Sequence, residues 1–156
     1  MIEFTVYGEP VPKGSTTPFP LMKDGKPVLG KGGRPVVVTT GANKGTKDWQ
    51  HLIAATAQRH VSEQLFDGPV DLEIKFYFLR PASVSEKKRP HMTIRPDLDK
   101  LCRSVFDALK GVIYTEDARI VRLSALKEYG DRPRVDIRVC GVGEEIPKNK
   151  QGVLFE

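Results

Sequence analysis

The stretch RPDLDKLCRSVFDALKG, residues 95–111, begins with two acids and continues as an amphipathic pattern. Its apolar positions recur at steps of three and four between Leu98 and Leu109, which is the period of a helix. Side chains two positions apart on a helix do not face the same way. Asp97 and Asp99 therefore converge on one ion only if Asp97 lies outside the helix, at the N-cap or just before it, and Asp is a favoured N-cap residue. We predict a helix from Leu98 to about residue 110.

A second acidic pair, Glu116-Asp117, follows one short turn after this helix. One face of the helix also carries Asp99, Arg103 and Asp107 at four-residue spacing. Acids from two elements among basic residues are typical of a divalent metal site that acts on phosphate. The alternative is structural: an Asp at a helix start often caps it, and Asp107 pairs with Arg103. The second acidic pair favours the metal site.

Composition predicts one globular domain. The chain has 156 residues, of which 39% are hydrophobic, and no apolar run approaches the length that spans a membrane. The two cysteines, Cys102 and Cys140, have no metal-ligand spacing, and Cys102 falls on the apolar stripe of the helix. We expect Cys102 to be buried, and we expect a reducing, cytoplasmic setting without membrane association.

Basic residues gather in two stretches rich in Gly, Pro, Ser and Thr, and the net charge is +5. Such basic loops around acidic residues suit a polyanion whose backbone is held by Lys and Arg, although an ordinary solvated surface is the simpler alternative. The candidate DNA-binding residues are Lys13, Lys23, Lys26, Lys31, Arg34, Lys87, Lys88, Arg89, Arg95 and Lys100.

The first basic stretch is a long insert, at about residues 8–45. It contains the turn signal Lys23-Asp24-Gly25-Lys26, and residues 35–40 have the composition of a return strand. We predict a basic hairpin or arm.

Alternating and apolar segments place the remaining elements. The expected strands are residues 2–7, 70–78, 119–129 and 134–139, and the expected helices are residues 48–64, with Thr46 as a cap, and 98–110. The order is β-α-β-α-β-β, which lacks the regular alternation of a doubly wound fold. We predict a single α+β domain over residues 1–140, with a mixed sheet and two helices packed on it. Residues 141–156 are expected to form a loose tail, to which no role is assigned.

Several segments resemble the RusA family of Holliday-junction resolvases, which are small phage and prophage endonucleases. They are RPDLDK at 95–100, DAL at 107–109, GVIYTED at 111–117 and, less specifically, GEPVPKG at 8–14. The resemblance implies a homodimer that nicks two strands of a four-way DNA junction symmetrically, with Mg²⁺ or Mn²⁺. It further implies that Asp97, Asp99 and Asp117 are catalytic and hold the metal. Arg103 stands where the family usually has its essential lysine, and Lys100 stands where asparagine is usual.

Two other functions remain open at the level of sequence. A non-catalytic phage or prophage DNA-binding protein that assists recombination would explain the basic loops, but not the acids. A small-molecule phosphatase with an Asp-x-Asp nucleophile would need a strand before its acids, whereas Asp97 and Asp99 open a helix.

Overall fold

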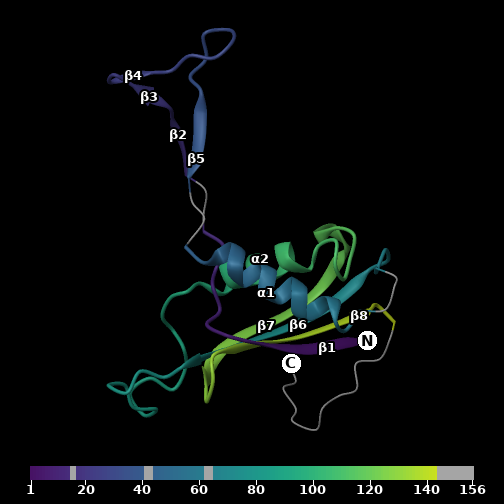
Figure 1. The fold of residues 1–156 in the computed structure, drawn as a ribbon. Helices are drawn as coiled ribbons and strands as arrows, with labels where there is room; N and C mark the ends of the chain where they lie inside the picture. Colours follow the sequence, from purple (N-terminus) through teal and green to yellow (C-terminus); the bar gives the residue numbers. More distant parts are fainter. Residues whose placement is uncertain (15–16, 41–43, 62–64, 144–156) are drawn as a thin grey trace.

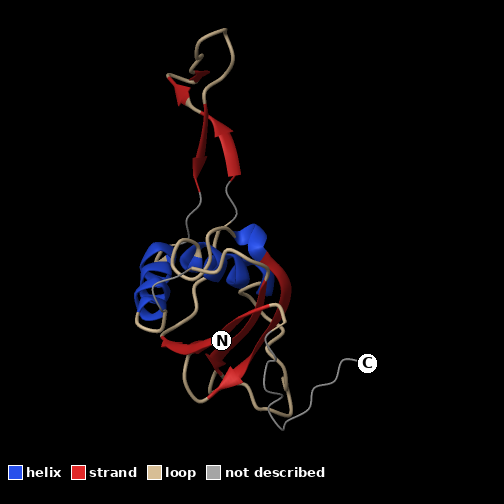
Figure 2. Cartoon of the chain, turned by 90° about the vertical axis from the view of Figure 1, so that its right-hand side faces the viewer, coloured by secondary structure: helices blue, strands red, loops and turns tan. Residues whose placement is uncertain are grey.

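The fold is a four-stranded mixed sheet with two helices on one face and a hairpin arm that extends away from them (Figures 1 and 2). The computed structural model describes residues 1–14, 17–40, 44–61 and 65–143. Its main elements are β1 (Ile2–Tyr7), α1 (Thr46–Gln58), β6 (Val70–Leu79), α2 (Leu98–Leu109), β7 (Ile120–Gly130) and β8 (Arg134–Gly141). The predicted α+β class and element order are confirmed. The tail predicted from residue 141 begins later, because Gly141 is the last residue of β8 and pairs with Val70; from residue 144 onward it lies outside the described residues.

The strand order is β1-β8-β6-β7. The pairs β1–β8 and β8–β6 are antiparallel, whereas β6 and β7 run parallel. Parallel neighbours need a crossover connection, and here that crossover contains α2. The crossover brings the acidic stretch onto the sheet, and β7 is left as an edge strand.

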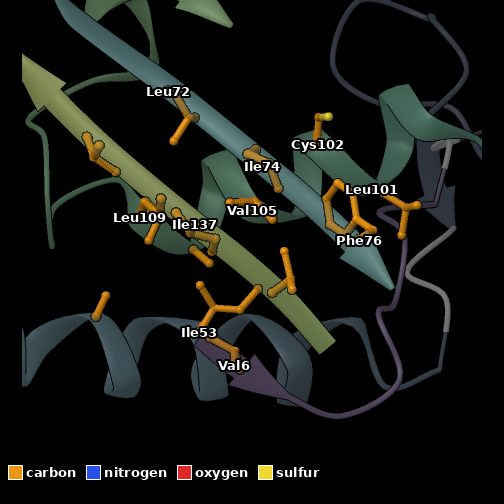
Figure 3. Close-up of a cluster of buried hydrophobic side chains, with 14 of the residues drawn as sticks. Val6, Ile53, Leu72, Ile74, Phe76, Leu101, Cys102, Val105, Leu109 and Ile137 are labelled. Atoms are coloured by element: carbon orange, nitrogen blue, oxygen red, sulfur yellow. The ribbon is translucent and has the colours of Figure 1, made fainter. Parts of the chain in front are cut away.

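The core lies between the sheet and the two helices, which pack against each other. Ile53 of α1 and Val105 of α2 meet Ile74 of β6 and Ile137 of β8, and all four are at most 1% exposed (Figure 3). Burial of each such side chain contributes roughly 1.5–3 kcal/mol to folding. Cys102 is also buried, as its place on the apolar stripe predicts.

The first helix differs from its prediction at both ends. Thr46 is not the cap but the first helical residue, and its hydroxyl donates to the Pro12 carbonyl at 3.1 Å, which ties the helix start to the segment after β1. The helix ends at Gln58 rather than near residue 64, and the predicted residues 62–64 lie outside the described part of the chain. Arg59 and His60 form a turn by bonding back to the carbonyls of Thr56 and Ala57, the three-residue spacing that tightens a last helical turn.

The predicted basic arm is confirmed. Its strands are β2 (Thr17–Pro20), β3 (Met22–Lys23), β4 (Lys26–Pro27) and β5 (Val37–Thr40). β2 pairs with β5, and β3 pairs with β4 around Asp24 and Gly25. These two turn residues have φ angles of 50° and 75°, and positive angles at both central positions suit a two-residue hairpin turn.

No helix in the described ranges has both the length and the apolar character needed to cross a membrane.

Candidate active site

The start of α2 presents two carboxylates beside a cation. Asp97 occupies the N-cap with an extended backbone, as predicted, but its side chain makes no capping hydrogen bond. Its Oδ2 atom instead lies 3.2 Å from the Lys100 Nζ atom. Asp99 is exposed in the first turn. The capping alternative is therefore wrong for Asp97.

A lysine on the sheet positions the segment that leads into α2. The Lys127 ammonium, on β7, donates to the carbonyls of Ile94 and Pro96, both at 2.7 Å. Helical bonding then begins with the Leu101 amide donating to the Asp97 carbonyl at 3.1 Å. Sequence patterns did not identify Lys127, because a lysine on a strand ordinarily indicates only a solvated position.

The second acidic pair folds back against the end of α2. The Gly111 amide donates to the Tyr114 carbonyl at 2.8 Å, and the buried Tyr114 hydroxyl donates to the Phe106 carbonyl at 3.2 Å. Asp117 then begins a short 3-10 helix, η1 (Asp117–Arg119), and so the following strand starts at Ile120. The Asp117 Oδ1 atom is buried and has no hydrogen-bond partner within the described structure. An unpaired buried acceptor is costly, which marks this carboxylate as a place for a ligand.

Electrostatic effects show which acids lie together. Burial raises the pKa of Tyr114, and the charges of Asp117 and Asp107 raise it further. The hydrogen bond and charge of Glu116 raise the pKa of Lys110, with smaller contributions from the same two aspartates. The Lys110 Nζ atom lies 2.5 Å from Glu116 Oε2, so the second acidic pair lies at the end of α2 that also carries Asp107. Asp99 is about 12 Å from Asp107 along the helix axis at 1.5 Å per residue.

The predicted metal ligands are thus divided between the two ends of α2. Among the residues that the structure describes, no three His, Cys, Asp or Glu side chains are placed to hold one ion together. The donors nevertheless fit Mg²⁺, which usually takes one or two protein carboxylates and fills its shell with water and phosphate oxygens. The buried, unpaired Asp117 oxygen is such a donor. The shared role of Asp97, Asp99 and Asp117 stays a prediction.

Arg103 lies between the two acidic ends. It is exposed, one helical turn from both Asp99 and Asp107, and it makes no hydrogen bond or ion pair with the described residues. Its guanidinium can therefore approach a phosphate, which such a group binds bidentately.

Lys13 also reaches α2, although it was predicted as part of the basic insert. Its amide donates to the Lys100 carbonyl at 2.9 Å, and its Nζ atom lies 2.6 Å from Asp107 Oδ2. Gln50 of α1 donates to the same carboxylate oxygen at 3.3 Å. The alternative pairing of Asp107 with Arg103 is therefore wrong. No local pattern indicated these contacts, because they join segments distant in sequence.

The other predicted DNA-binding residues lie in two places, on the arm and in the loop between β6 and α2. Lys23, Lys26, Lys31 and Arg34 are exposed along the arm, whereas Lys87, Lys88 and Arg95 are exposed in the loop between β6 and α2. This loop lies near the β7–β8 turn (Figure 1), where the Arg80 guanidinium stacks 4.2 Å above the Tyr129 ring and donates to the Arg89 carbonyl. Arg89 in turn donates to the Tyr129 hydroxyl at 3.5 Å.

Comparisons with known proteins agree with these features. The family described as endodeoxyribonuclease RusA matches residues 18–140, a range that contains both helices and the acidic residues. The uncharacterized protein YqaN of Bacillus subtilis (strain 168) is 33% identical over 147 residues, which cover 88% of this chain and 94% of YqaN. With this match over most of its length, the chain belongs to the endodeoxyribonuclease RusA family, whose members are DNA endonucleases.

Proposed function

We propose that this protein is a metal-dependent endodeoxyribonuclease that resolves four-way DNA junctions. It would act as a homodimer and make paired symmetric nicks by phosphodiester hydrolysis, with Mg²⁺ as the cofactor and Mn²⁺ as a substitute. Membership of the endodeoxyribonuclease RusA family supports the nuclease class. The observation that carries the catalytic part is the buried Asp117 oxygen without a partner, beside a helix that starts with Asp97 and Asp99.

The roles of the residues follow from their positions. Asp97, Asp99 and Asp117 would hold the metal; because Asp117 lies at the other end of α2 from the first two within one chain, all three would reach one ion only once these two ends are brought together. When bound, Mg²⁺ polarises a phosphoryl oxygen and lowers the pKa of a water. Arg103 would bind the scissile phosphate and offset the charge that develops in the transition state. Lys100, which neutralises Asp97 at 3.2 Å, would have to release that carboxylate for it to reach the ion.

The basic surfaces would hold the substrate. The exposed residues of the arm and of the loop before α2 would bind DNA phosphates along the strands that lead to the branch. Such contacts position the DNA without reading its bases.

The decisive experiment compares a labelled four-way junction with a matched linear duplex, in Mg²⁺ and in EDTA. We expect junction-specific paired cleavage in Mg²⁺, none in EDTA, and loss of cleavage in Asp117→Asn with binding kept. Asp131→Asn is the matched control, because Asp131 is an exposed aspartate paired with Arg134 in the β7–β8 turn. Cleavage that is equal in EDTA would overturn the metal-dependent mechanism.

One observation favours a non-catalytic DNA-binding role instead. Within the described ranges, no three metal-binding side chains are already assembled. A protein of that kind would bind the junction tightly and cut it in neither Mg²⁺ nor Mn²⁺. The same assay therefore separates the two functions.

A further inference from the structure

Strand β7 has a free backbone edge. It pairs with β6 alone, and none of its backbone groups bonds to any other element among the described residues. It is also long, at 11 residues, and its pairing with β6 is regular after the shift at Asp71. Long, regular edge strands are ready to pair with another strand unless something protects them.

The side chains of β7 indicate an apolar partner. Val121, Leu123 and Leu126 are 63%, 45% and 38% exposed, an unusual density of large apolar groups on one edge. The opposite edge of the sheet, β1, has only 6 residues, and its Glu3 is held by Arg138 at 3.2 Å. Among the described residues neither edge strand has a second neighbour, and β7 is the longer and the more apolar of the two on its exposed side chains.

Charged side chains normally keep an edge strand from pairing with another strand, but two of the three charged residues of β7 already bind other groups of the protein. Lys127 is bound to the carbonyls of Ile94 and Pro96, and Arg122 lies 3.0 Å from the nearly buried Asp71. Glu128 is exposed and has no hydrogen-bond or ion-pair partner in the described chain. The Arg122 guanidinium keeps donors to spare, because it has five N–H groups.

We propose that β7 pairs antiparallel with β7 of a second copy, around a twofold axis at Ala125. In this register Arg122 stands directly opposite the partner's Glu128, and the twofold axis repeats that ion pair on the other side. The small Ala125 faces the partner's Ala125, and Ser124 faces the partner's Leu126. Registers centred on Ser124 or Leu126 place no opposite charges together. This proposal rests on the homodimer of the proposed function and specifies its interface.

The pairing has a consequence for the site. The two four-stranded sheets become one continuous sheet, and a twofold axis perpendicular to it keeps both helix layers on the same side. Both copies of α2 then lie on one face of the dimer. With both α2 sites on one face, the dimer could cut two strands of the same junction. A twofold axis within the plane of the sheet would instead place the two α2 sites on opposite faces of the dimer.

Cysteine cross-linking tests the register without DNA or metal. Directly opposite residues have Cβ atoms about 5 Å apart, whereas diagonal neighbours are roughly 7–8 Å apart, beyond easy disulfide reach. Under mild oxidation we expect Ala125→Cys to form a disulfide-linked dimer. Ser124→Cys and Leu126→Cys should each fail alone but link when the two proteins are mixed. Tyr7→Cys, exposed on β1, is the control, and the native Cys102 and Cys140 are buried.

A charge reversal tests the same interface by a second route. Glu128→Arg should place like charges opposite each other twice and shift the protein toward monomer in light scattering. Glu86→Arg, an equal charge change in the exposed loop before α2, should leave the mass unchanged. Three results would each overturn the proposed interface. They are a disulfide-linked dimer of Ser124→Cys alone or Leu126→Cys alone, no disulfide-linked dimer with any variant, and a dimer whose mass does not change in Glu128→Arg. The cleavage assay is read separately, so a nuclease with another interface is distinguishable from a protein without activity.

Discussion

The arm should contribute to DNA binding in proportion to its free charges. Lys23, Lys26, Lys31 and Arg34 are exposed, and none forms an ion pair with the described residues. All four are therefore available to phosphates. Changing them together to Ala should weaken binding to junction and linear duplex alike, because phosphate contacts carry no base information.

The magnitude follows from counterion release. Each lost phosphate contact reduces the slope of log K against log salt by about 0.9, so four contacts reduce it by about 3.6. Over a fourfold rise in salt, from about 50 to about 200 mM, the wild-type protein should lose roughly 150-fold more affinity than the variant. Folding should be unaffected, because exposed surface substitutions usually change stability by about 0.5 kcal/mol or less.

Fluorescence anisotropy across a salt series measures this slope. A two-residue variant, Lys23→Ala with Lys26→Ala, should give about half the change. Its matched control is Arg59→Ala with Arg132→Ala, which removes the same charge from exposed positions at the end of α1 and in the β7–β8 turn. A four-residue variant with an unchanged salt slope, or a control pair that flattens the slope equally, would refute the arm as a DNA-binding element.

Three further predictions concern α2 and its surroundings. Asp97→Asn, Asp99→Asn and Asp117→Asn should each abolish Mg²⁺-dependent cleavage while junction binding survives or improves, since each removes negative charge but keeps size; near wild-type cleavage by any one would contradict its role. Arg103→Lys should keep much of the cleavage rate and Arg103→Ala should lose most of it, because the exposed cation is one turn from Asp99; equal rates would assign that role elsewhere. Burial raises the pKa of the Cys102 thiol to about 11, so the reactive thiolate is scarce near neutral pH and becomes common only as the pH rises toward that value. Native protein should therefore react slowly with a thiol reagent at neutral pH and fast once unfolded. Cys102→Ser should remove the part of this reaction that comes from Cys102.

Local sequence patterns were sufficient to predict most of the secondary structure. The three- and four-residue spacing from Leu98 to Leu109 determined α2, and the alternation after Val70 determined β6. Asp24-Gly25 predicted the hairpin turn of the arm, because these residue types tolerate the positive φ angles that such a turn requires. Both residues adopt positive φ angles in the structure. Each of these features depends on interactions between near neighbours. The position of Asp97 at the start of α2 could likewise be predicted from the neighbouring residues, because helix starts depend on local sequence.

The arrangement of the site depended on contacts between segments far apart in the chain. The sequence identified Asp97, Asp99, Asp117 and Arg103 as candidates and placed Asp117 after the helix, but it did not show that the turn holds the second acidic pair against the end of α2 rather than returning it to the helix start.

The anchors of the site are Lys127 on the carbonyls of Ile94 and Pro96, and Lys13 on Asp107. A lone lysine has the same local pattern whether it is solvated or holds a distant carbonyl. The parallel pairing of β6 with β7, which leaves β7 at the edge, likewise has no local signal, because strand neighbours are chosen by packing of the whole chain rather than by either strand alone.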